Sequence, residues 1–329
     1  MRKRRFLRLL GGALAWPALA FPQQGAIRRV GVLVPLAESD AEAQREIAAF
    51  RDELRTLGWI DGKNLRLEVR WGGGEAARIR EFAQEIVAAK PDVILTRATP
   101  PTKAVLAATR SIPVVFVVVA DPVGDGLIDS LARPGGNLTG FTNVEGSLGG
   151  KWLELLREIA PRISRVGAIY NPKTAPGGGA YYWRLVEQAA GAMRVKVDAA
   201  QVHDAAATEQ AIDALAREPN AGLLVMPDIS NVRHRKVIIA AAARHRLPAI
   251  YPIPTFTLDG GLASYGVDIP DLYRRSAGYV ERILRGAKPS ELPVQSPVKF
   301  DLTINAKTAK AQGIPVPRSL LMRADRVID

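Results

Sequence analysis

The chain has 329 residues, of which 47% are hydrophobic, and a formal net charge of +12. This length can bury two cores more comfortably than one. The absence of cysteine excludes disulfides, a thiol nucleophile and cysteine-ligated metals. The positive residues are scattered among acidic neighbours instead of forming a basic stripe with aromatic residues, so the charge does not indicate a nucleic-acid partner.

Residues 1–20 predict a cleaved export signal. A basic segment, Met1–Arg8, precedes a short apolar run, Leu9–Leu19, and the small-residue triplet Ala18–Ala20 predicts cleavage before Phe21. The apolar run is too short to span a bilayer. Five positive charges lie in this leader, so 12 minus 5 leaves a formal charge of +7 for the mature chain.

The route of export is left open between two alternatives. Lys3–Arg8 approximates a twin-arginine signal, although Lys replaces the first Arg, and ordinary Sec export fits as well. An amphipathic anchor helix is the other interpretation of the leader, but Gly11, Gly12 and Pro17 argue against it. No later segment reaches the ~18 apolar residues of a membrane span. We therefore expect a periplasmic protein that is soluble after signal cleavage.

The remaining chain alternates β-rich runs with amphipathic stretches, a rhythm that predicts parallel sheets with right-handed crossovers. The expected strands, in chain order, are 29–35, 65–71, 93–96, 114–119, 165–170, 195–203, 222–226 and 249–253. The expected helices are 42–57, 75–89, 180–193, 208–215, 231–245 and 271–285.

A Gly/Pro/Asn-rich stretch at 121–150 interrupts this rhythm. Two αβ series separated by such a break favour two similar lobes over one long sheet, with the break as a hinge. The predicted fold class is therefore α/β, with two doubly wound parallel-sheet lobes. Ligands of open α/β sheets lie beyond the carboxyl ends of the strands, so two facing lobes would enclose a ligand between them.

Several blocks give the chain a family resemblance. Gly126–Gly140 with the preceding Ala120–Val123, Gly260–Gly266, Ile283–Pro289 and the closing Arg323–Ile328 resemble the ABC transporter substrate-binding family related to tryptophan- and tyrosine-binding proteins. The resemblance covers nearly the whole mature chain in order and spacing. It implies a type I periplasmic-binding fold, a two-lobed flytrap with three crossovers.

The resemblance also implies where the chain passes between the lobes: near Phe141, near Tyr265 and near Pro293. The first lobe would then comprise 21–141 and 265–293, and the second 142–264 and 294–329. The helix expected at 271–285 would belong to the first lobe.

Candidate ligand contacts in the first lobe follow strand ends. Ser39, beside Asp40, could cap a helix and leave backbone N–H groups facing the cleft. Thr99 as N-cap, with Pro100 at the first helical position, predicts a helix start whose N–H groups suit a carboxylate. Both positions are also compatible with ordinary capped helices. Asp121 could pair with a ligand ammonium or order the hinge loop through Asx-type bonds, and we favour the second.

Candidates in the second lobe also follow strand ends. Asn171 ends one predicted strand, and Asp228 follows another. Asp228 could face the cleft, or it could be an ordinary exposed carboxylate in a loop. Tyr251, Phe256 and Tyr265 could form an aromatic wall, although we expect one or two of the three rings to belong to the core. The cluster Tyr181–Trp183 could line the rim, but packing on a helix face is the favoured interpretation.

Enzymatic motifs are missing from the sequence. There is no Gly-x-Gly-x-x-Gly after the first strand, no phosphate-binding Gly-x-x-x-x-Gly-Lys-Ser/Thr and no Gly-x-Ser-x-Gly, and the three histidines have no metal spacing. We therefore expect no catalytic residue, cofactor or metal. The expected function is a monomeric periplasmic solute-binding protein that binds an amino acid or related carboxylate, aromatic or aliphatic, and delivers it to an ABC permease. The alternative is a sensory or orphan binding protein that presents its ligand to a membrane receptor.

Overall fold

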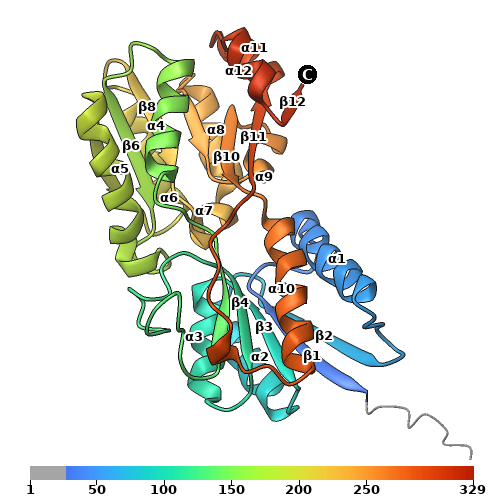
Figure 1. The fold of residues 1–329 in the computed structure, drawn as a ribbon. Coiled ribbons are helices and arrows are strands. Elements are labelled where there is room, and N and C mark those ends of the chain that lie inside the picture. Colours follow the sequence, from blue (N-terminus) through green and yellow to red (C-terminus); the bar gives the residue numbers. More distant parts are fainter. Residues whose placement is uncertain (1–26) are drawn as a thin grey trace, which may run out of the picture.

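A computed structural model describes residues 27–329, so the predicted export signal and its cleavage point lie outside the described residues. The chain forms two α/β lobes, one above the other in Figure 1, each built around its own sheet. The two-lobed α/β architecture predicted from the sequence rhythm is therefore confirmed. Over the described residues, no helix combines the length and apolarity needed to cross a membrane.

The first lobe contains a five-stranded sheet in which all neighbours are parallel. Its inner strands are short and mostly apolar because helices cover both faces, whereas the edge strand β2 alternates apolar and charged residues. In sheet order they are β2 (Leu65–Trp71), β1 (Arg28–Val34), β3 (Val93–Arg97), β4 (Val114–Val119) and β5 (Leu138–Thr142).

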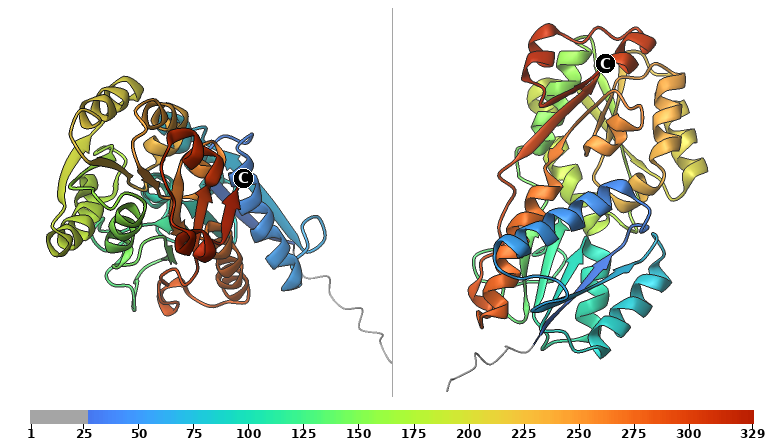
Figure 2. Two further views of the ribbon diagram at one scale, coloured as in Figure 1. Left: turned by 90° about the horizontal axis from the view of Figure 1, so that it is seen from above. Right: turned by 90° about the vertical axis from the view of Figure 1, so that its right-hand side faces the viewer.

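Two helix pairs enclose this sheet. On one face α1 and α10 pack together over a core that includes Phe50 and Tyr273, whereas α2 and α3 cover the other face. Figure 2 shows α1 lying across the α10 side of the lobe. The helices are α1 (Ala41–Thr56), α2 (Ala76–Ala88), α3 (Thr99–Ala108) and α10 (Ile269–Leu284), followed by the short helix η2 (Pro289–Glu291).

The second lobe contains a seven-stranded sheet. It departs from the expected all-parallel pattern at one place, because β10 and β11 are antiparallel. The reason is that β11 enters from the third crossover and runs away from the first lobe. In sheet order the strands are β12 (Arg326–Ile328), β11 (Phe300–Asn305), β10 (Ala263–Val267), β9 (Ala249–Tyr251), β8 (Ala221–Val225), β6 (Arg165–Tyr170) and β7 (Lys196–Gln201).

Helices cover both faces of the second sheet as well. α4 and α5 share one apolar cluster with α11 and α12, whereas α6, α8 and α9 build the cluster on the other face. The helices are α4 (Leu148–Ile159), η1 (Pro176–Gly179), α5 (Ala180–Met193), α6 (Ala205–Leu215), α7 (Ile229–Arg233), α8 (Arg235–Arg244), α9 (Pro254–Leu258), α11 (Ala306–Gln312) and α12 (Arg318–Arg323).

The chain passes between the lobes three times, after β5, after β10 and after η2. The first and third passages run side by side, because Phe141 and Gln295 form a parallel bridge and the Thr142 amide donates to the Gln295 carbonyl at 2.9 Å. Arg275 of α10 lies over the Phe141 ring at 5.1 Å and donates to the Gln295 side chain. These contacts tie α10 to the two adjoining crossover segments.

Two details differ from the sequence-based expectations. Tyr265 lies in the middle of β10, within the second sheet, so the second crossover follows Val267 rather than occurring at Tyr265. The helix expected at 231–245 is two helices, because His234 leaves helical geometry with φ −94° and ψ 13°. Residue-type periodicity cannot detect a break of one residue between two helical turns.

Candidate functional site

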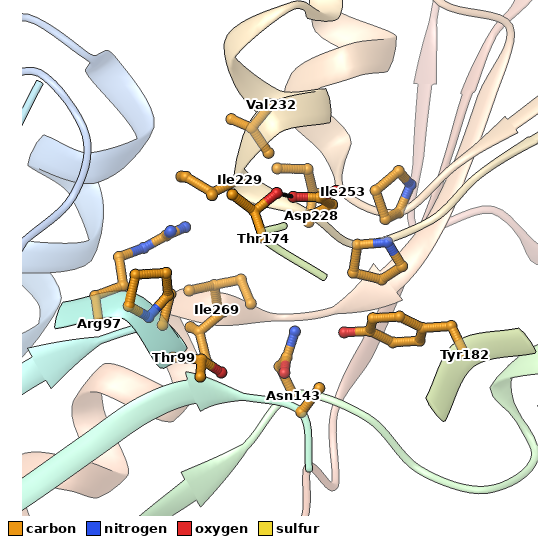
Figure 3. A pocket seen from close by; sticks show the side chains of 16 residues that line it. Arg97, Thr99, Asn143, Thr174, Tyr182, Asp228, Ile229, Val232, Ile253 and Ile269 are labelled. Atoms are coloured by element: carbon orange, nitrogen blue, oxygen red, sulfur yellow. Dashed lines mark hydrogen bonds between the residues drawn. The ribbon is translucent and has the colours of Figure 1, made fainter. Parts of the chain in front are cut away.

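A cleft lies between the lobes, at the carboxyl ends of their strands. This is where open α/β sheets bind ligands. Figure 3 shows its polar side chains converging from three directions: Arg97 and Thr99 from the first lobe, Thr174, Tyr182 and Asp228 from the second, and Asn143 from the first crossover.

Most of the remaining lining is aliphatic. Five branched side chains contribute, and they are Val118, Ile229, Val232, Ile253 and Ile269. Tyr182 is the aromatic member of the lining. A concave, mainly apolar surface with a few converging polar groups is typical of a small-molecule site.

Two lining residues have a strained backbone. Ala98 has φ 68° and ψ 165°, and Val118 has φ 60°, where the pairing of β4 with β5 shifts register between Val117 and Val119. Such conformations cost non-glycine residues roughly 1–3 kcal/mol each and cluster at functional sites. The strain at both positions supports a ligand-binding role for the cleft.

Asp228 is the carboxylate of the cleft lining, and its position is fixed by three donors. It follows β8 and caps α7, where it accepts from the Ser230 amide at 2.9 Å. It also accepts from the Asn171 amide at 2.7 Å and from the Thr174 hydroxyl. Burial raises the pKa of Asp228, and these hydrogen bonds offset only part of that effect. A carboxylate has about four lone-pair sites, so one acceptor position is left for a ligand.

Arg97 is the cationic residue of the lining. It ends β3 and forms a bidentate pair with Glu46 of α1, with Nε–Oε2 at 2.7 Å and Nη2–Oε1 at 2.9 Å. Both side chains are almost fully buried. Burial lowers the pKa of Arg97, but the charge and hydrogen bonds of Glu46 outweigh it and hold the pKa above its usual value. Neither Arg97 nor Glu46 was among the contacts predicted from the sequence. The signal that could have identified Arg97 is a charged residue at the end of an apolar strand.

Thr99 lines the cleft, but the helix start around it differs from the prediction. The N-cap is Ala98, and Thr99 is the first residue of α3. Pro100 and Pro101 follow, and proline has no backbone N–H. The first turn therefore lacks two of the N–H donors that were expected to suit a carboxylate, and the Thr99 hydroxyl donates to Asp125 at 3.5 Å.

Asn143 and Tyr182 form a polar pair that the sequence reasoning did not select. Asn143 follows β5, and its Oδ1 is buried without a hydrogen-bond partner among the described residues. In Figure 3 the Tyr182 hydroxyl points towards this amide. Burial keeps the pKa of Tyr182 well above its usual value, so the phenol stays protonated. The sequence reasoning placed Tyr181–Trp183 on a packing face, and Tyr182 in fact belongs both to the core and to the cleft wall.

Three other predicted contacts lie outside the cleft lining. Ser39 is exposed, because the neighbouring Asp40 takes the N-cap position of α1. The Asp121 carboxylate accepts from the Gly124 amide at 2.8 Å, as the favoured loop-ordering role requires. Asn171 is buried behind Asp228, and its Nδ2 donates to the Ser230 hydroxyl at 3.2 Å. Asn171 thus positions the Asp228 loop rather than facing the cleft.

The two predicted tyrosines also point elsewhere. Tyr251 is fully buried and stacks on Phe256 with 5.1 Å between the ring centroids, so it belongs to the core. Tyr265 stacks on Phe300 and faces a separate surface hollow beside α4 and α5. Of the seven predicted residues, Thr99 and Asp228 are therefore brought together in the cleft. Within residues 27–329 no group of His, Asp or Glu side chains could hold a metal.

The lobes touch across the cleft through α7 and its surroundings. Ile229 and Val232 pack against the apolar cluster of the first lobe. Arg233 donates to the Gly74 carbonyl at 3.4 Å, and Arg235 lies 3.9 Å from Asp40. The structure therefore has the two lobes in contact around the site.

Comparisons with known proteins agree with this geometry. Residues 29–328 match the family model described as ABC transporter substrate binding protein, which confirms the resemblance seen in the sequence. A tyrosine-binding protein from Clostridioides difficile is 26% identical over 265 residues, covering 80% of this chain and 74% of that protein.

Two solved structures share the fold, each with a TM-score of 0.84 and covering 92% of this chain. One is a conserved domain protein from Vibrio cholerae, 29% identical and covered over 99% of its length. The other is an ABC domain in complex with L-Trp from Streptococcus pneumoniae, 23% identical and covered over 100%. The type I periplasmic-binding fold expected from the resemblance is confirmed.

Proposed function

Because the chain belongs to the ABC transporter substrate-binding protein family, we propose that it is an exported solute-binding protein that closes its lobes around an amino acid or a related carboxylate. It acts as a monomer in the periplasm and delivers its ligand to an ABC permease in the inner membrane. It performs no chemistry on the ligand.

The observation that carries this proposal is the composition of the cleft. Thr99 and Arg97 of one lobe face Asp228 and Thr174 of the other across an aliphatic lining. A ligand that contacts both lobes does so only when they are closed, and so its binding shifts the population towards the closed form. The closed form then presents matched surfaces of both lobes to the permease.

The relatives favour amino acids as the ligand class. One is named a tyrosine-binding protein and another was solved with L-Trp. An α-amino acid carries a carboxylate and an ammonium, and the cleft offers a cation in Arg97 and a carboxylate in Asp228. The lining is more aliphatic than aromatic, which extends the candidates to aliphatic amino acids.

A thermal-shift screen of the mature protein tests the proposal. The panel contains the twenty amino acids, aromatic acids, sugars and nucleosides. A ligand at about 100 times its Kd adds roughly 2.7 kcal/mol of stability, which raises the midpoint by several degrees. A selective shift with one or a few amino acids is the expected result. If only sugars or nucleosides raise the midpoint, the ligand class is one of these and not amino acids. If no compound in the panel raises the midpoint, the result counts against the transport role.

A further inference from the structure

The Glu46–Arg97 pair is an unusual element for the wall of an apolar cleft. Glu46 has 0% exposure and Arg97 has 5%. Removing two charges from water is unfavourable, and apolar side chains of similar volume are often as stabilising or more so. Stability alone therefore gives no reason to place this pair beside the cleft.

The pairing leaves part of the guanidinium unused. Arginine has five N–H donors in a fixed plane, and Glu46 accepts from Nε and Nη2. The described residues provide no other hydrogen bond of good geometry to Nη1 or to the second N–H of Nη2, although the buried Tyr273 hydroxyl lies beside the pair. Because Arg97 lines the cleft, a ligand can reach these donors.

Glu46 has little freedom to move away from Arg97. It projects from the buried face of α1, which packs against α10 through the edge-to-face pair Phe50–Tyr273. The bidentate geometry therefore fixes the plane of the guanidinium as well as its position. A lysine at position 97 would keep the charge but lose the planar fork.

The rest of the lining offers no comparable anion-binding group. Arg97 is its cationic side chain, and Asp228 on the opposite lobe is anionic. The start of α3 is a weak alternative, because Pro100 and Pro101 remove two N–H donors from its first turn.

We propose that Arg97 binds the carboxylate of the ligand and that Glu46 is a positioning residue that directs the free edge of the guanidinium into the cleft. The inference rests on the proposed function, and it identifies the carboxylate as the ligand group that the first lobe recognises. The ligand ammonium then lies towards Asp228, so the two charges of one amino acid contact opposite lobes.

Matched acid and amide probes isolate the carboxylate contact. Isothermal titration of the mature protein uses L-tyrosine, L-tryptophan and L-leucine beside their C-terminal carboxamides, which keep the ammonium and side chain. We expect the wild type to prefer the acid by at least about 30-fold, the scale of a buried charged hydrogen bond. In Arg97→Met/Glu46→Gln, which leaves no lone buried charge, the acid-to-amide ratio should fall to within about 3-fold.

Two further variants separate positioning from folding. Glu46→Asp keeps the charge but withdraws the carboxylate by one methylene, and it should lower acid affinity while leaving amide affinity unchanged. If the double variant does not fold, Arg97→Lys replaces it in the titrations. This variant should lower the acid-to-amide affinity ratio about 10-fold. The control is Arg165→Met/Asp198→Asn, which removes an ion pair of 2.6 Å between the first residue of β6 and the third residue of β7, outside the cleft lining; its ratio should equal that of the wild type.

The outcomes distinguish this inference from the proposed function. Equal affinity of the wild type for acid and amide, or a preference that survives in the Arg97 variants, overturns the inference and leaves amino-acid binding in place. Binding of neither probe series by the wild type overturns the proposed ligand class, and the inference with it. Loss of the ratio in the Arg97 variants but not in the control supports both.

Discussion

Replacing Asp228 by alanine tests whether this carboxylate organises the second-lobe side of the cleft. The side chain accepts from the amides of Asn171 and Ser230 and from the Thr174 hydroxyl, and it is only 7% exposed. Loss of the N-cap of α7 costs about 1 kcal/mol. The buried Asn171 amide loses its acceptor, at about 1–3 kcal/mol, and the partly buried Thr174 hydroxyl loses a hydrogen bond worth about 0.5–1.5 kcal/mol. The free energy of unfolding should therefore fall by at least about 2.5 kcal/mol.

Asp204 provides the matched control. It caps α6 from an exposed position and accepts from one amide, that of Ala207 at 2.8 Å. Asp204→Ala should therefore cost about 1 kcal/mol. Urea unfolding followed by circular dichroism, with unchanged denaturant slopes, gives both free energies. Equal losses in the two variants would show that the donors of Asn171 and Thr174 gain nothing from Asp228, and would refute the reasoning.

Three other predictions follow from single positions. Tyr182→Phe should weaken ligand binding about 2- to 12-fold through loss of one hydrogen bond, whereas Tyr251→Phe, in the core, should leave the Kd measured by titration unchanged. Burial raises the pKa of Asp228 above its usual value, so the folded chain holds this proton to a higher pH than the unfolded chain. As pH rises through that window, the wild type should lose stability relative to Asp228→Asn in paired urea titrations. A Cβ at Gly140 would lie 2.1 Å from a backbone oxygen of β4, so Gly140→Ala should cost about 3 kcal/mol or more; Gly146→Ala, with open space around it, should stay within about 0.5 kcal/mol in the same assay.

The fold was predictable because its signals are local and repeated. Strands such as Val114–Val119 are continuous apolar runs, as parallel strands covered on both faces must be. The break at His234 and the antiparallel β11 were not predictable in the same way. The first depends on one residue's backbone angles, and the second on the route that the chain takes from the third crossover.

The cleft was harder to predict because position after a strand does not fix side-chain direction. Tyr251 and Asp228 both lie at or just after a strand end, yet Tyr251 packs in the core and Asp228 lines the cleft. Asp228 follows its strand and faces the cleft because three donors hold it there. Two of those donors, Asn171 and Thr174, come from the loop after β6, and the third, Ser230, comes from α7. No spacing along the sequence reveals that they meet.

The short helix α7 connects the site to the contact between lobes. Its N-cap, Asp228, lies in the cleft, and its single turn places Ile229 and Val232 against the apolar cluster of the first lobe. Its last residue, Arg233, donates to the Gly74 carbonyl across the lobes. The helix is only one turn long and ends at the break at His234, so its cleft-facing cap and its contacts with the first lobe lie within six consecutive residues, 228–233. Under the proposed function, a ligand that contacts Asp228 would bind next to the segment through which the lobes touch.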